Sequence, residues 1–169
     1  MIRVLLLIVL LPTFAMTQGI YASLDGSMAP LDLNGTVSIG YHTKGLHMGA
    51  GIGMSKVTFQ NSVIKSYGLY HPVFIDISYI IPNRKFSPYI AARGGMLMSG
   101  KNNVLDSPID IDGSSLSSVK VGAAFRKGGM YIVPFAHYSM QHFDKAGSRN
   151  VGVPCRIQGL GGGVNLVFY

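Results

Sequence analysis

The chain has 169 residues, of which 12% are charged and 48% hydrophobic, and its formal net charge is +7. This length allows one domain, and the charged share is about half that of an average globular protein. Such a composition is poorly suited to a surface that meets only water. It also makes nucleic acid a poor partner, whereas lipid headgroups or lipopolysaccharide phosphates suit the basic charge.

The first residues have the order of a secretory signal peptide. Arg3 precedes the apolar run 4–11, and small residues follow this run. The run is too short to span a bilayer, and its order of basic, apolar and small residues is typical of a cleaved leader. We therefore expect a signal peptide over residues 1–17, cleaved at a bond between residues 15 and 19, and a single domain over residues 18–169.

Beyond this leader, apolar residues alternate with small or polar ones, which is the period of a strand with one apolar face. The alternating segments occupy residues 18–26, 33–42, 46–55, 68–81, 86–98, 117–125, 130–141 and 159–169. The short connections, which contain the Gly, Pro or Asn of hairpin turns, are 43–45, 82–85 and 126–129. The longer and more polar connections are 27–32, 60–67, 99–113 and 143–153.

Short turns that alternate with long loops are typical of outer-membrane barrels, whose short turns are periplasmic. No apolar run after the leader reaches the ~20 residues of a membrane helix, and only a closed sheet otherwise satisfies its backbone in lipid. We predict an all-β fold: an eight-stranded antiparallel transmembrane β-barrel, an up-and-down meander with both termini periplasmic. The alternative is a soluble lipocalin-like barrel with its apolar face inward, which would need more charges on the opposite face.

Three charged residues within the strands, Asp76, Arg93 and Lys120, lie on the face opposite to the apolar one. Counting back from the turn between 68–81 and 86–98 makes Asp76 and Arg93 cross-strand neighbours, with Lys120 on the next strand. We predict that these residues form an ionic cluster that plugs the lumen, because paired charges can be tolerated there and an unpaired buried charge is costly. An eight-stranded lumen is about filled by its side chains, which argues against a general diffusion pore.

One pair of residues suggests catalysis. His137 and Ser139 are two apart on a strand, so they share a face, and a nearby His can activate a Ser hydroxyl. The five histidines lack the paired spacing of a metal site, and Gly49, Gly51 and Gly53 lie on a strand face instead of at a nucleotide-binding turn. We therefore predict neither a metal nor a cofactor.

The last residues resemble a known assembly signal. The segment "GVNLVF" has Gly163, Val164, Leu166 and Phe168 in an alternating pattern, with Tyr169 after it. It resembles the C-terminal signal of bacterial outer-membrane barrels, and this resemblance implies recognition by the barrel-assembly machinery during biogenesis. The extra Tyr169 departs from the usual pattern, and we expect it at the membrane interface with Phe168 facing lipid.

Two longer segments resemble a family. "HPVFIDISYIIPNRKFSPYIAARGGMLM" (71–98) and "SSVKVGAAFRKGGMYIVPFAHYSMQ" (117–141) resemble the small outer-membrane β-barrel domains common in Bacteroidota. The resemblance implies an integral outer-membrane protein, with a structural, adhesive or surface-interaction role in its outer loops. We expect outer-membrane lipid and lipopolysaccharide as its surroundings and a monomer as its state.

The His-x-Ser pattern at His137 and Ser139 resembles that of the outer-membrane lipid A deacylases, which are also eight-stranded barrels. In that family an Asn follows the Ser, whereas this chain has Met140, and Pro154 stands where the acid that orients the His is expected. Strand parity also points His137 and Ser139 toward the lumen. A deacylase-like hydrolase, with Ser139 as nucleophile and His137 as base, is thus the alternative to a protein without catalytic activity.

Overall fold

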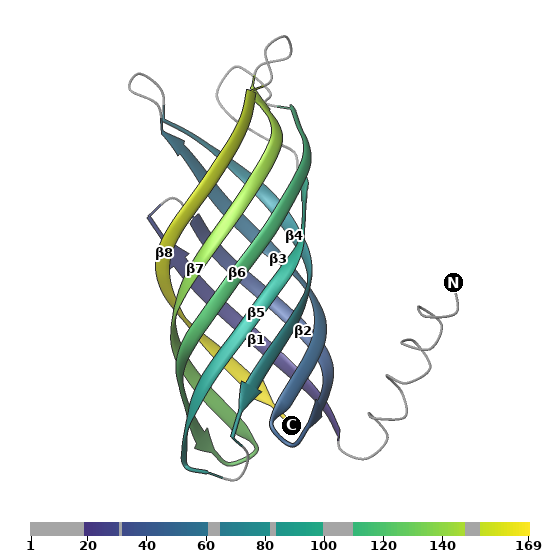
Figure 1. Ribbon diagram of the computed structural model, residues 1–169, viewed down its shortest axis with the longest axis vertical. Coiled ribbons are helices and arrows are strands. Elements are labelled where there is room, and N and C mark those ends of the chain that lie inside the picture. Colours follow the sequence, from purple (N-terminus) through teal and green to yellow (C-terminus); the bar gives the residue numbers. More distant parts are fainter. Residues whose placement is uncertain (1–18, 31, 61–64, 82–83, 100–109, 148–152) are drawn as a thin grey trace, which may run out of the picture.

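Eight strands form one closed barrel in the computed structural model, which describes residues 19–30, 32–60, 65–81, 84–99, 110–147 and 153–169 (Figure 1). The strands are β1 (Gly19–Ala29), β2 (Asp32–Thr43), β3 (Leu46–Gln60), β4 (Lys65–Ile80), β5 (Phe86–Ser99), β6 (Asp110–Lys127), β7 (Met130–Gly147) and β8 (Val153–Phe168). Each strand is antiparallel to the next, and β8 is antiparallel to β1. The predicted eight-stranded antiparallel meander is confirmed. The expected signal peptide lies outside the described residues.

The two ends of the barrel differ in their connections. At one end, named the turn end here, β1 begins, β8 ends, and short turns join β2 to β3, β4 to β5, and β6 to β7. Lys44 and Gly45 have φ of 47° and 90°, and Gly128 has φ of 62°. Positive φ at both central residues suits the twist of a two-residue hairpin turn, and glycine adopts it readily. The other end is named the loop end.

The strands run further toward the loop end than the sequence predicted. Only residues 30–31 separate β1 from β2, where a loop over 27–32 was expected, and β6 begins at Asp110 and β7 ends at Gly147. The predicted loops 60–67, 99–113 and 143–153 therefore overlap strand residues. Apolar alternation marks only the part of a strand that has an apolar face. The ladder hydrogen bonds join backbone groups, so they continue beyond the last apolar residue.

Closure of the barrel holds the end of the chain in the sheet. Residues 162–168 pair with residues 22–28 of β1, and Phe168 also pairs with Met130 of β7. The terminal strand thus has hydrogen-bonded neighbours on both sides. This pairing explains how an apolar segment ends the chain without fraying.

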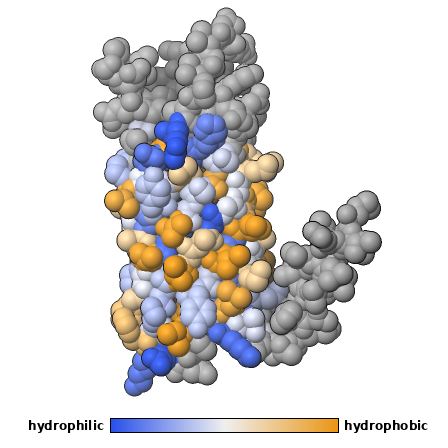
Figure 2. Space-filling model, in the orientation of Figure 1, coloured by the Kyte–Doolittle hydropathy of each residue, from blue (hydrophilic) through white to orange (hydrophobic). Residues whose placement is uncertain are grey.

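The two faces of the sheet have opposite polarity. Ile39, Ile52 and Ile75 point outward and are 63%, 64% and 67% exposed, and apolar residues gather over the middle of the face seen in Figure 2. Inward positions carry Ser, Asp, Arg and Lys side chains, most of them less than 10% exposed. A lipocalin-like barrel would need the reverse orientation. No helix among the described residues is long and apolar enough to cross a membrane.

We expect a bilayer to surround this apolar belt, and a depth-dependent substitution tests it. Ile75 lies near the middle of the belt, and Leu69 lies on the same outward face nearer the loop end. Ile75→Lys should lower the free energy of unfolding in phosphatidylcholine vesicles by about 2–4 kcal/mol, and Leu69→Lys by about 0–1 kcal/mol. Urea unfolding followed by circular dichroism measures both. Equal losses at the two depths would contradict a surrounding bilayer.

Candidate functional site in the barrel lumen

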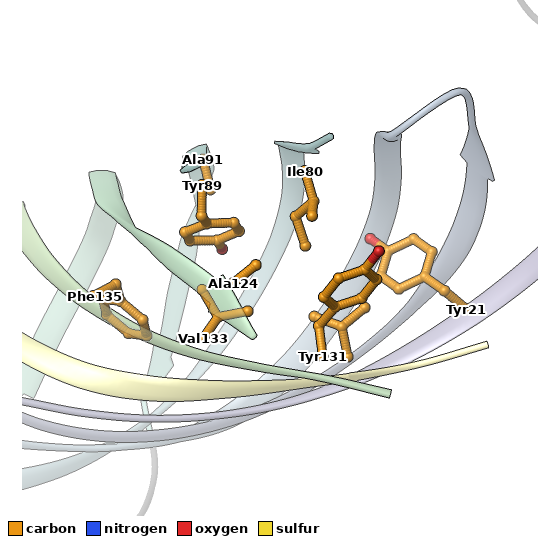
Figure 3. Packing of buried hydrophobic residues seen from close by; sticks show 9 residues of the cluster. Tyr21, Ile80, Tyr89, Ala91, Ala124, Tyr131, Val133 and Phe135 are labelled. Atoms are coloured by element: carbon orange, nitrogen blue, oxygen red, sulfur yellow. The ribbon is translucent and has the colours of Figure 1, made fainter. Parts of the chain in front are cut away.

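Apolar and aromatic side chains pack together in the half of the lumen nearest the turn end (Figure 3). Each of these residues is 6% exposed or less, and the set consists of Tyr21, Ile80, Tyr89, Ala91, Ala124, Tyr131, Val133, Phe135 and Val167. In Figure 3 the aromatic rings of Tyr89, Tyr131 and Phe135 point into the enclosed space. This layer was not predicted, although strand parity places Val133 and Phe135 on the same face as His137.

Two glycines of β3 make room for aromatic side chains in the lumen. A Cβ at Gly49 would contact the hydroxyl of Tyr21, and one at Gly51 would contact the ring of Phe74. A Cβ at either position would therefore overlap a buried aromatic side chain. The glycines thus allow bulky side chains to cross a narrow barrel.

An ionic cluster centred on Asp25 lies next to the aromatic layer, on the side of the loop end. The Asp25 carboxylate contacts the ammonium of Lys120 and lies 3.6 Å from Nη2 of Arg93. Arg93 also donates a hydrogen bond of 3.1 Å to Oγ1 of Thr36. The cluster therefore joins β1, β2, β5 and β6 across the lumen.

Asp76, Arg93 and Lys120 all lie in this part of the lumen, with exposed fractions of 9%, 9% and 4%. Asp76 and Arg93 are Cα partners in the ladder between β4 and β5. The two ion pairs that the described residues form nevertheless end on Asp25, and Oδ1 of Asp76 accepts no hydrogen bond from them. Sequence reasoning missed Asp25 because only closure of the barrel brings β1 opposite β5 and β6.

Aromatic faces support both cations of the cluster. The guanidinium carbon of Arg93 lies 3.8 Å from the ring centroid of Phe74, and Nζ of Lys120 lies 4.5 Å from that of Phe135. Such cation–π contacts are stronger when they are shielded from water. The charged layer and the aromatic layer therefore stabilise each other.

A second polar cluster surrounds Asp32 nearer the loop end. Ser55 donates a hydrogen bond of 2.9 Å to Oδ1 of Asp32, and Nε2 of Gln141 donates one of 2.8 Å to Oδ2. Asn34 donates to the same Oδ2. Because Gln141 belongs to β7, this cluster crosses the lumen from β2. Asp32 was expected in a loop, so its inward position could not be predicted.

His137 and Ser139 point into the lumen with exposed fractions of 4% and 6%. Their Cα partners are Lys120 and Ser118 on β6, and Gly161 and Gly159 on β8. Nδ1 of His137 is buried and has no hydrogen-bond partner among the described residues. Both side chains therefore face away from the apolar exterior.

The C-terminal residues close the turn end. Phe168 faces outward, at 37% exposed, whereas the Tyr169 hydroxyl is 2.7 Å from Nε2 of His47. His47 also stacks on His42, with ring centroids 5.8 Å apart. These rings line a cavity of about 240 Å³ at the mouth of the barrel. The Tyr169 ring therefore packs against these histidines at the lumen opening and stays 46% exposed, and its place at the membrane interface remains a prediction.

The residues before Phe168 alternate between the outward face of β8 and the lumen. Val164 is 45% exposed on the outward face, and Leu166 is half-buried on the same face. A Cβ at Gly163 would contact the backbone of β1 and the ring of Phe135. Gly163 thus gives the aromatic layer its space on β8.

No family model and no curated protein matches the sequence. The crystal structure of Neisserial surface protein A (NspA) matches with a TM-score of 0.58 and 14% identity, over 88% of this chain and 94% of that chain. The N-terminal β-barrel domain of Pseudomonas aeruginosa OprF matches with a TM-score of 0.42 and 14% identity, over 88% and 96%. The outer membrane enzyme PagL matches with a TM-score of 0.41 and 9% identity, over 87% and 99%.

At this identity, the likeness to NspA establishes a shared fold. The fold and the lumen together define a small closed eight-stranded barrel with an apolar exterior and an interior filled by aromatic, ionic and hydrogen-bonded layers. The resemblance to Bacteroidota barrels stays a prediction.

Asp25 is the residue whose removal tests the ionic layer. Asp25→Asn leaves Arg93 and Lys120 buried without their shared carboxylate, and we expect the free energy of unfolding to fall by about 3–5 kcal/mol. Lys120→Met retains the aliphatic stem and removes one cation. Adding it to Asp25→Asn should therefore recover part of the loss. A double-mutant cycle in urea measures the coupling, and a coupling energy near zero would contradict the assigned pairing.

Proposed function

We propose that the protein is an integral outer-membrane barrel with a sealed lumen, which acts through its loop end in a structural, adhesive or surface-interaction role. The observation that carries this proposal is the polarity of the sheet, because outward isoleucines surround a lumen that holds buried ion pairs. An apolar exterior and a polar interior are what a bilayer requires of a barrel. The shared fold with NspA supports the same reading.

The three layers of side chains favour a sealed lumen and argue against an open pore. Aromatic rings fill the turn-end half, the Asp25 cluster joins four strands above it, and the Asp32 cluster joins β2 to β7 nearer the loop end. The interior of an eight-stranded barrel is just wide enough for side chains to fill. These layers leave solutes no route through the lumen, and contacts with partners belong to the outside of the barrel.

The orientation follows from the connections. Outer-membrane barrels have short periplasmic turns and longer outer connections, so the turn end faces the periplasm and the loop end faces outward. Lys56 and Arg156 are exposed toward the loop end, where lipopolysaccharide phosphates would suit their charge. The connection between β5 and β6, residues 100–109, is the longest at this end and offers the largest segment for contact with a partner.

A deacylase-like activity is the alternative that the sequence raised, with Ser139 as nucleophile and His137 as base. Lipid acyl chains lie outside the barrel, whereas both side chains lie inside it. Catalysis on lipid A would require the β7 backbone to turn these residues outward. The geometry therefore favours a role without catalysis.

Ion conductance tests the sealed lumen. The full mature protein, reconstituted into a planar bilayer, should show no stable single-channel steps. The triple variant Tyr89→Ala, Tyr131→Ala, Phe135→Ala removes three rings of the aromatic layer and should leak ions, provided that it keeps the heat-modifiable gel shift of a folded barrel. Regular channel steps from the unaltered protein would refute the proposal.

Ser139→Ala tests the catalytic alternative. A mass spectrum of lipid A from cells that produce the unaltered protein should match that from cells without it, and Ser139→Ala should change nothing, because Ser139 lies within the lumen. Loss of one acyl chain in cells with the unaltered protein, reversed by Ser139→Ala, would establish the deacylase instead.

A further inference from the structure

Among the described residues, the turn end carries cationic side chains and no acidic one. Five exposed cations lie in its short turns or at the strand end beside them: Lys44, Arg84, Lys85, Arg126 and Lys127. The chain has seven acidic residues, all aspartate. Three of them, Asp25, Asp32 and Asp76, point into the lumen. Asp110, Asp112 and Asp144 belong to the loop-end parts of β6 and β7, and Asp106 lies outside the described residues. This separation of charge leaves the turn end able to attract anions.

Two of these cations, Arg84 and Lys127, lie two residues from one aromatic pair, whereas Arg126 lines the cavity at the barrel mouth. Phe86 and Phe125 are Cα partners at the turn end of β5 and β6, and their rings meet edge to face with centroids 5.3 Å apart. Both rings point outward and are 58% and 45% exposed. The amide of Arg126 donates a hydrogen bond of 3.0 Å to the carbonyl of Lys85, so the ladder continues past the aromatic pair into the cationic turns.

The phenylalanine pair and the cations beside it lie at adjacent depths along the barrel axis. The phenylalanine pair continues the apolar belt of β5 and β6, which includes Ile90 and Val121 on the same outward face. Arg84 precedes Phe86 by two residues, and Lys127 follows Phe125 by two. Cations therefore flank the aromatic pair on the side away from the belt. We call Arg84, Phe86, Phe125 and Lys127 the turn-end rim.

We infer that the turn-end rim binds an anionic phospholipid of the periplasmic leaflet, with its phosphate at the cations and its acyl chains against Phe86 and Phe125. This inference rests on the proposed outer-membrane location. Anionic headgroups attract basic segments at a membrane surface, and aromatic rings settle at the level of the headgroups. A phospholipid carries a phosphate and acyl chains at these same adjacent depths, whereas an acidic polymer in the aqueous periplasm matches the cations alone.

Native mass spectrometry of the full mature protein tests the inference, with phosphatidylglycerol and phosphatidylcholine as the probes. The unaltered barrel should retain phosphatidylglycerol in preference to phosphatidylcholine. Arg84→Gln with Lys127→Gln should lower the apparent affinity for phosphatidylglycerol by roughly tenfold, because two charges near the phosphate are lost. The affinity for phosphatidylcholine should not change.

Two further variants serve as controls. Lys56→Gln with Arg156→Gln removes the same charge from β3 and β8, which are not adjacent strands, and should retain the preference. Arg84→Lys keeps the charge and should also retain it. The heat-modifiable gel shift confirms that each variant is folded.

The possible outcomes separate this inference from the proposed function. A barrel that inserts into vesicles yet binds both lipids equally, or a double variant at Arg84 and Lys127 that binds phosphatidylglycerol as the unaltered protein does, would overturn the inference alone. Failure to insert into any vesicle would overturn the proposed function as well. Binding to purified peptidoglycan that depends on Arg84 and Lys127, without a lipid preference, would assign the turn-end rim to an acidic polymer and overturn the lipid site.

Discussion

Pairing of β1 with β8 is the constraint on which the remaining structure depends. It gives the first and last strands their second neighbours, so the sheet has no free edge, as a bilayer interior demands. The same pairing encloses a lumen and brings Asp25 opposite Arg93 and Lys120. An open sheet of the same strands would leave these charges in separate places and would have no interior to fill.

The strands, their order and the facing of their side chains could be predicted from the sequence, because alternation with a period of two is a local signal. The neighbouring positions of Asp76 and Arg93 followed from counting back from one turn, and the ladder shows them as partners. The strand ends near the loop end could not be predicted, since Asp110 and Gly147 lie where no apolar alternation marks a strand.

The contacts across the lumen were beyond the reach of sequence reasoning for a different reason. Asp25 meets Lys120, and Asp32 meets Gln141, between strands that are not neighbours in the sheet. Such contacts depend on the tilt and stagger with which eight strands close. The aromatic layer was missed through an expectation about composition: a lumen assumed to be polar left no place for Tyr131 or Phe135, although their parity pointed inward.

The distance along the chain between lumen partners bears on the order of assembly. Asp25 and Lys120 are 95 residues apart, Asp32 and Gln141 are 109 apart, and His47 and Tyr169 are 122 apart. Contacts between remote residues form late, because the intervening chain must first be ordered. Asp25 thus stays without its cations until β5 and β6 are in place, and His47 gains its hydroxyl partner only with the last residue. A barrel that lacks its final strands therefore keeps polar groups without their hydrogen-bond or ion-pair partners, and it is less stable than the closed barrel.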